Sequence, residues 1–160
     1  MRSRSGFTLV EILIVVVILG ILAAIVVPQF TNASVEAQNS RLMQDLQSVR
    51  SQIELYKIQH SGAFPTAGGR TFEQAMTGYT VQDGSIGVVG AEGAYGPYLQ
   101  KLPSNPYVTT ADMAKDSVVA GTAAPGGELA GWYFNTTTGA FNADDKTDGD
   151  KDGVADHADW

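Results

Sequence analysis

The sequence contains no cysteine and only two histidines, His60 and His157. Without cysteine, disulfide bonds, zinc-thiolate sites, iron-sulfur clusters and thiol catalysis are excluded. The histidines form no HExxH pair, and the glycines form neither a dinucleotide-binding fingerprint nor a P-loop, so the sequence predicts no enzyme. Basic residues are also few, with 10 lysines and arginines against 17 acidic residues. A general nucleic-acid binder needs a basic surface, so no nucleic-acid partner is expected.

The sequence does contain one long apolar run near its N-terminus. Of the 21 residues 7–27, 18 are apolar, and residues 12–35 carry no charge. A helix of about 20 such residues crosses the hydrocarbon core of a bilayer, so a transmembrane helix is predicted here. Arg2 and Arg4 precede the run, which predicts a cytoplasmic N-terminus and an external C-terminal part. A cleaved secretory signal peptide is the alternative, but its apolar segment would be shorter, about 7–15 residues.

Glu11 is an ionisable residue inside this apolar run. Such residues are rare within membranes, and they usually have a partner or a function. One interpretation is that Glu11 lies near the interface and reaches toward water. The other is that its carboxylate needs a positive partner when the helix packs against other helices.

A resemblance rests on this segment. The run Gly6-Phe7-Thr8-Leu9-Val10-Glu11-Ile12, followed by an aliphatic helix and Pro28, closely resembles the N-terminal signal of type IV pilins and pseudopilins. The resemblance implies that a prepilin peptidase cuts between Gly6 and Phe7 and methylates the new amine of Phe7. It also implies that Glu11 pairs with the N-terminal amine of a neighbouring subunit in a helical filament. A charge pair in a low dielectric would fix the register of that assembly.

Helical character continues beyond Pro28, although proline lacks an N–H and normally interrupts a helix. An apolar stripe at gaps of 4, 3, 4 and 3 residues predicts a helix to about residue 60; it comprises Leu42, Leu46, Val49, Ile53 and Tyr56. The stripe is explained either by packing against a small domain or by a coiled-coil dimer. The run is short for a coiled coil, which favours packing.

The remaining sequence predicts a small domain. Residues 132–135 and 140–142 are β-prone runs around a short loop with glycine, which predicts a hairpin. Residues 72–76 are expected to form a helical turn, and residues 85–89 and 107–110 short strands. A helix followed by strands indicates an α+β fold, with a small antiparallel sheet covering the apolar stripe.

Two further segments refine the resemblance. Residues 55–57 with 62–66 look like the helix end and the following loop of the major pseudopilin of type II secretion, and so do residues 96–103 ahead of 105–107. Many members have Asp at the position of Asn105 and Trp at that of Tyr107. Adhesive type IV pilins commonly close their C-terminal region with a disulfide, which this chain cannot form. The resemblance therefore favours the pseudopilin branch, and a type IV pilin for adhesion, motility or DNA uptake stays the alternative.

The C-terminal end is acidic, with seven of the 17 acidic residues between Asp144 and Asp159. Spacing like that of a calcium loop is seen in Asp148, Asp150, Asp152, Asp156 and Asp159, with Asp144 and Asp145 as possible further ligands. Calcium binds six to eight oxygens, which alternating aspartates supply. The resemblance also implies calcium in place of a disulfide. The other interpretation is a solvated, disordered acidic tail.

Together these features predict a pilin-like α+β subunit of a bacterial inner-membrane secretion machine, with a periplasmic C-terminal domain. Five segments are expected: a leader at 1–6, an assembly helix at 7–28, an amphipathic helix at 29–61, a small domain at 62–143 and an acidic loop at 144–160. The resemblance implies four partners, namely further copies of the chain, minor pseudopilins, a prepilin peptidase and an inner-membrane assembly platform. Growth of the filament would help to drive protein export across the outer membrane. A membrane-tethered calcium-dependent hydrolase is the remote alternative.

Overall fold

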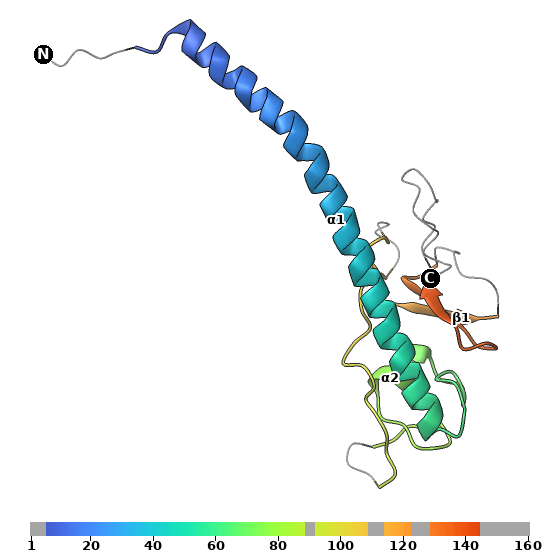
Figure 1. The fold of residues 1–160 in the computed structure, drawn as a ribbon. Coiled ribbons are helices and arrows are strands. Elements are labelled where there is room, and N and C mark those ends of the chain that lie inside the picture. The colour runs from blue at the N-terminus through green and yellow to red at the C-terminus, as the bar shows by residue number, and fades with distance from the viewer. Residues whose placement is uncertain (1–5, 89–91, 109–113, 123–128, 145–160) are drawn as a thin grey trace, which may run out of the picture. The chain divides into compact units, whose positions relative to one another are not determined.

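A computed structural model of the chain describes residues 6–88, 92–108, 114–122 and 129–144 (Figure 1). The chain divides between Ser40 and Arg41 into two compact units, and each is described by itself. Helix α1, Leu9–Gln59, contributes residues to both units. The five segments expected from the sequence stay predictions.

In the first unit α1 is apolar and continuous through Pro28. The predicted helix is therefore confirmed, and it ends at Gln59, one residue before the expected end. The described residues contain one helix that is long and apolar enough to cross a membrane, and it is α1. Three residues after Pro28, the Thr31 hydroxyl donates to the carbonyl of Val27 at 3.3 Å.

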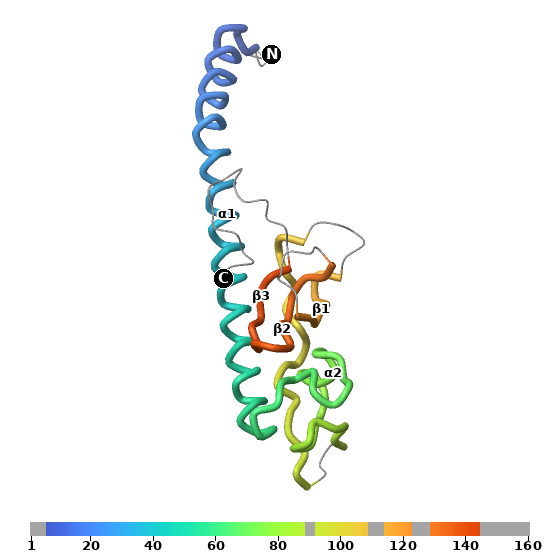
Figure 2. The backbone as a smooth tube through the Cα atoms, turned by 90° about the vertical axis from the view of Figure 1, so that its right-hand side faces the viewer, coloured from blue at the N-terminus to red at the C-terminus, as the bar shows by residue number. Residues whose placement is uncertain are grey.

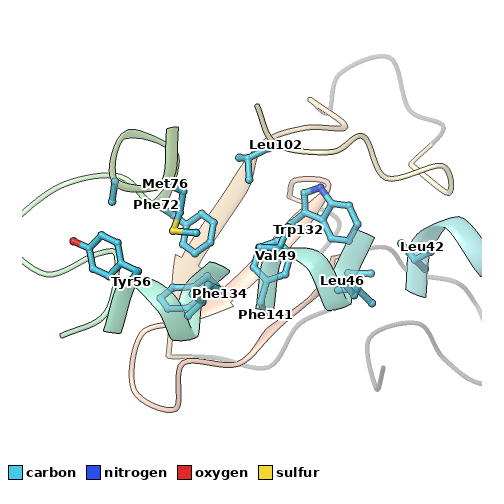
Figure 3. Close-up of a cluster of buried hydrophobic side chains, with 13 residues drawn as sticks. Leu42, Leu46, Val49, Tyr56, Phe72, Met76, Leu102, Trp132, Phe134 and Phe141 are labelled. Atoms are coloured by element: carbon cyan, nitrogen blue, oxygen red, sulfur yellow. The ribbon is translucent and has the colours of Figure 1, made fainter. Parts of the chain in front are cut away.

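In the second unit the C-terminal half of α1 carries the core. All five residues of the predicted stripe are buried, namely Leu42, Leu46, Val49, Ile53 and Tyr56. They pack with aromatic side chains of the following domain, among them Phe72, Trp132, Phe134 and Phe141 (Figure 3). Removing this apolar surface from water drives the packing. The stripe is thus used within one chain, as the packing explanation predicts.

The sheet has three strands in the order β1-β2-β3: β1 is Val118–Gly121, β2 is Trp132–Asn135 and β3 is Phe141–Ala143 (Figure 2). Strands β2 and β3 pair antiparallel, with Phe134 opposite Phe141, so the predicted hairpin is confirmed. Strand β1 pairs parallel with β2, with Val118 opposite Trp132. The α+β fold is confirmed, but the sheet is mixed and not wholly antiparallel.

Two predicted strands are wrong in the described residues. Of residues 85–88, only Ile86 forms a bridge, with Thr80. The Asp83 carboxylate accepts the N–H of Ser85 at 2.8 Å, which turns the chain there and holds the pKa of Asp83 below its ordinary value. Residues 107–108 form no strand, because the Asn105 side chain accepts the N–H of Tyr107 at 2.9 Å in a local turn. Strand β1, in contrast, was not predicted.

The short helix α2, Phe72–Thr77, matches the expected helical turn. It begins with a capping box, in which the Thr71 hydroxyl accepts the N–H of Gln74 and the Gln74 side chain accepts the N–H of Thr71. This exchange satisfies two backbone donors that a helix start leaves without partners. Phe72 and Met76 of α2 then point into the core.

An aromatic cluster closes the C-terminal end of α1. His60 is buried and stacks on Tyr56 with 3.7 Å between ring centroids, and its Nδ1 lies 2.8 Å from the Tyr56 carbonyl. Tyr98 packs against both rings and donates from its hydroxyl to Gln59 at 2.5 Å. Burial raises the pKa of Tyr98 to about 12. His60 is therefore part of the core.

Gly139 and Gly93 form a matched pair for measuring one close contact. Both have φ of +78°, but a Cβ on Gly139 would lie 2.3 Å from the Phe64 ring, whereas one on Gly93 meets nothing within 4 Å. We expect Gly93→Ala to cost about 1 kcal/mol of left-handed strain and Gly139→Ala about 2–3 kcal/mol, because the ring must also move. Urea unfolding of both full-length variants in detergent measures the difference. Equal losses would show that the Phe64 ring moves freely.

Candidate assembly surface

The residues around the predicted cleavage site lie just before α1. Gly6, Phe7 and Thr8 are outside the helix and exposed, with 81% of Phe7 accessible. A Cβ added at Gly6 would meet no atom within 4 Å. The described fold therefore makes no demand for glycine at this position.

Glu11 lies in the first turn of α1, where Thr8 caps the helix. Its Oε2 accepts the backbone N–H of Thr8 at 2.8 Å and the Thr8 hydroxyl at 2.7 Å, while that hydroxyl accepts the N–H of Glu11 at 3.3 Å. This is a capping box, which the spacing Thr-x-x-Glu could have predicted and the sequence reasoning missed. Glu11 is thus hydrogen-bonded within its own chain, and its side chain is exposed at the start of the apolar helix.

The apolar part of α1 is exposed all round. Every large apolar side chain from Phe7 to Phe30 is exposed, from 43% at Val26 to 82% at Leu9. Aliphatic side chains in this number are stable in lipid or against other apolar helices, and not in water. This segment is therefore a surface for a membrane or for neighbouring helices.

A small hollow of about 210 Å³ lies on this helix next to Pro28. It is lined by Val26, Gln29, Phe30 and Ala33. Phe30 is 73% exposed at its edge. Phe30 and Pro28 therefore interrupt the aliphatic surface of the helix at the C-terminal end of the apolar run.

Among the predicted calcium ligands, only Asp144 is a described residue; Asp145, Asp148, Asp150, Asp152, Asp156 and Asp159 lie outside the described ranges. Asp144 follows β3 and is buried. Its Oδ2 accepts the N–H groups of Leu129 and Ala130 at 3.0 and 3.2 Å. These bonds hold the loop before β2 against the start of the acidic segment.

Residues 6–88, 92–108, 114–122 and 129–144 contain no group of three or more His, Asp or Glu side chains that could hold a metal ion. Asp144 on its own does not make a calcium site. His60 is used in core packing, and His157 lies outside the described residues.

Comparison with known proteins connects these features. Residues 1–27 match the family described as the prokaryotic N-terminal methylation motif. The type II secretion system core protein G of Klebsiella michiganensis is 32% identical over 109 residues, which cover 66% of this chain and 70% of that protein. Its counterpart in Vibrio cholerae is 32% identical over 107 residues, covering 67% of this chain and 68% of that protein.

The chain belongs to the type II secretion system core protein G family. The resemblance based on Gly6, Phe7 and Glu11 is thereby confirmed at the level of the family. The type IV major fimbrial protein FimA of Dichelobacter nodosus is also similar, at 33% identity over 109 residues, but this match covers only 55% of that protein. No solved structure is significantly similar to the chain.

Proposed function

We propose that this core protein G family member is a pseudopilin that acts by assembly, not catalysis. The observation that carries the proposal is the exposed apolar segment of α1, which begins within the residues that match the methylation motif. In the precursor this helix would lie in the inner membrane, with the N-terminus cytoplasmic and the C-terminal domain periplasmic. In the filament it would lie against the same helix of other subunits.

Processing would occur at the junction that precedes α1. A prepilin peptidase would cut between Gly6 and Phe7, remove the leader 1–6 and methylate Phe7. The exposure of Phe7 and the absence of contacts around Gly6 support access of an enzyme to this bond. The partners would be further copies of the chain, minor pseudopilins and an inner-membrane assembly platform.

Assembly would exchange one partner of Glu11 for another. The carboxylate that accepts hydrogen bonds from Thr8 in the single chain would pair with the amine of Phe7 on a neighbouring subunit. An ionised carboxylate among apolar helices is costly unless it is paired, so correct packing would be favoured over other registers.

Glu11→Ala is therefore expected to insert and be processed normally but to give about tenfold fewer filaments, because the register-fixing pair is lost. Sheared filaments quantified by immunoblot against total processed subunit measure the effect. Thr8→Val serves as the control for the capping box, since it keeps Glu11. Wild-type filament yield from Glu11→Ala would contradict the proposed charge pair.

We also propose that calcium binds the acidic C-terminal segment. The aspartate spacing from Asp148 to Asp159 supports this, and so does the oxygen-only chemistry of the carboxylates. Buried Asp144 would anchor the start of the segment to the sheet. Bound calcium would offset the mutual repulsion of these carboxylates and stabilise the fold.

Calcium is expected to raise the unfolding midpoint of the full-length protein in detergent relative to excess EGTA. Ligand that binds only the folded state adds about 3 kcal/mol of stability at 100 times its dissociation constant. Asp150→Ala combined with Asp152→Ala should abolish the rise, and Asp116→Ala, an exposed aspartate elsewhere, should keep it. Identical melting curves with calcium and EGTA would exclude the site.

The proposed function is tested by expressing the chain with the secretion apparatus of a relative whose own core protein G gene is deleted. We expect restored export of folded proteins and filaments on overproduction. The similarity to a fimbrial protein supports a type IV pilin as the second candidate. Surface fibres without restored export would favour that candidate, and soluble, unassembled protein would contradict both.

A further inference from the structure

An arginine without a matching acidic group lines a small pocket beside α2. Arg70 lies immediately before the helix cap Thr71. The pocket has a volume of about 280 Å³, and Arg70, Gln74, Thr77, Tyr79, Ile86 and Gly87 line it. It is formed wholly by residues of the second unit.

The pocket offers hydrogen-bond donors. The Arg70 Nη2 is buried and has no hydrogen-bond partner among the residues that the structure describes. The Gln74 Oε1 already accepts the N–H of Thr71, so its amide NH₂ is the group left to donate. The Thr77 hydroxyl donates to the Glu73 carbonyl at 2.8 Å. A guanidinium beside an amide donor is complementary to a carboxylate, which accepts two hydrogen bonds in one plane.

In the part of the chain that the structure describes, Arg70 forms no ion pair. The ion pairs among the described residues involve other side chains, Arg41 with Asp45 and Lys57 with Glu54. The Asp83 carboxylate accepts the N–H of Ser85, and the positive charge of Arg70 is a smaller cause of the lowered pKa of Asp83. A buried N–H group without a partner is costly, so a hydrogen-bond acceptor from another molecule would stabilise this end of the half-buried Arg70 side chain.

A second copy of the chain can supply that partner. Acidic residues outnumber basic ones by 17 to 10. Three exposed carboxylates make no hydrogen bond or ion pair with the described residues, namely Glu36, Glu92 and Asp116. Ile86, 82% exposed at the pocket, adds an apolar edge of the kind found beside interface arginines.

We infer that the Arg70 pocket binds an acidic side chain of a second copy of this chain. The inference rests on the proposed function as a self-assembling subunit. Each copy then carries both the pocket and the carboxylate, so the contact repeats along a filament without closing on itself. Arg70 would link the globular domains, separately from the helix contacts of Glu11.

Filament yield tests the contact. Arg70→Gln should reduce sheared filaments at least about fivefold and Arg70→Glu should abolish them, whereas Lys101→Gln and Lys101→Glu, the same changes at an exposed lysine, should not. One of Glu36→Arg, Glu92→Arg or Asp116→Arg should restore assembly to Arg70→Glu. Wild-type yield from Arg70→Gln would overturn the inference. A lowered thermal unfolding midpoint of unassembled Arg70→Gln would also overturn it, because the loss of filaments would then reflect a role of Arg70 in the stability of its own domain.

Cross-linking separates this contact from the proposed function. Since the chain has no cysteine, Arg70→Cys combined with a cysteine at 36, 92 or 116 can be joined by a short bismaleimide in intact membranes. Dimers from one of these pairs support the contact whether or not the cysteine variant forms filaments, because Arg70→Cys itself removes the arginine. The proposed function fails alone if these dimers form but the wild type neither assembles nor restores export. Filaments without any such dimer overturn the contact alone. If inorganic phosphate raises the thermal unfolding midpoint of the unassembled wild type but not of Arg70→Gln, and Arg70→Gln still forms normal filaments, the pocket is a site for a free anion instead.

Discussion

Gly6→Ala is expected to leave essentially all of the chain as uncut precursor. The peptidase must bring the backbone on both sides of the 6–7 bond into its active site, and a methyl group on residue 6 would occupy space next to that bond. The structure shows that this substitution costs the protein itself nothing, because a Cβ at Gly6 meets no atom within 4 Å. The loss would therefore report recognition by the enzyme and not misfolding. Mass spectrometry of membrane-extracted protein measures the N-terminus directly.

Gly20→Ala is the matched control for this prediction. It makes the same chemical change in the same helix-bearing unit, and its Cβ also meets nothing within 4 Å. It should be processed and methylated like the wild type. If Gly6→Ala yields mature chains that begin with Phe7, the peptidase does not require glycine at residue 6, and mature chains with any other N-terminus would show that the leader 1–6 has been placed wrongly. Precursor accumulation in both variants would point to a general defect of membrane insertion.

The parts of the fold that were predictable depend on local periodicity. The stripe from Leu42 to Tyr56 repeats with the helical period, and its burial follows from that repeat alone. A short loop that contains Gly139 connects β2 and β3, so residues that are close in the sequence also determine how these two strands pair. Both predictions needed no knowledge of distant contacts.

What the sequence could not predict depends on pairing across long separations. Val118–Gly121 is short and has no alternation of burial, and it becomes a strand because β2 lies beside it in parallel. The Val118 N–H also needs the carboxylate of Glu73, 45 residues earlier, to cover the sheet edge. Residues 107–108 failed as a strand for the opposite reason, since a local bond from Tyr107 to Asn105 is stronger than their β propensity.

The candidate site was predicted unevenly for the same reason. Gly6, Phe7 and Glu11 were found because they belong to one contiguous motif. Arg70 carries no motif, and its importance depends on Gln74, Ile86 and the buried state of its Nη2, which only the folded chain brings together. The bonds from Glu11 to Thr8 fall between these cases, because a four-residue capping pattern does predict them.

Gly131→Ala is expected to unfold the second unit more than any other glycine substitution discussed above. A Cβ at residue 131 would lie 2.0 Å from the Lys115 carbonyl oxygen and 2.6 Å from its carbon, so backbone must move. The two segments are joined through buried Asn105, whose N–H donates to Lys115 at 2.9 Å and whose side-chain amide donates to Gly131 at 2.8 Å. Separating them would break these bonds and strain the start of β2, at a cost of about 3–5 kcal/mol.

Urea unfolding of the full-length protein in detergent measures this cost, with near-ultraviolet circular dichroism as the signal of aromatic packing around Trp132. Gly93→Ala is the control, since it adds the same methyl group in open space and should lose only about 1 kcal/mol to its positive φ. A domain of this size has an unfolding free energy of about 5–15 kcal/mol in total. At roughly 4–8 °C per kcal/mol, Gly131→Ala should melt at least about 8 °C below Gly93→Ala. Equal midpoints would show that the 114–115 segment does not press against residue 131. The clamp that Asn105 makes between the two segments would then contribute little to holding β2 in place.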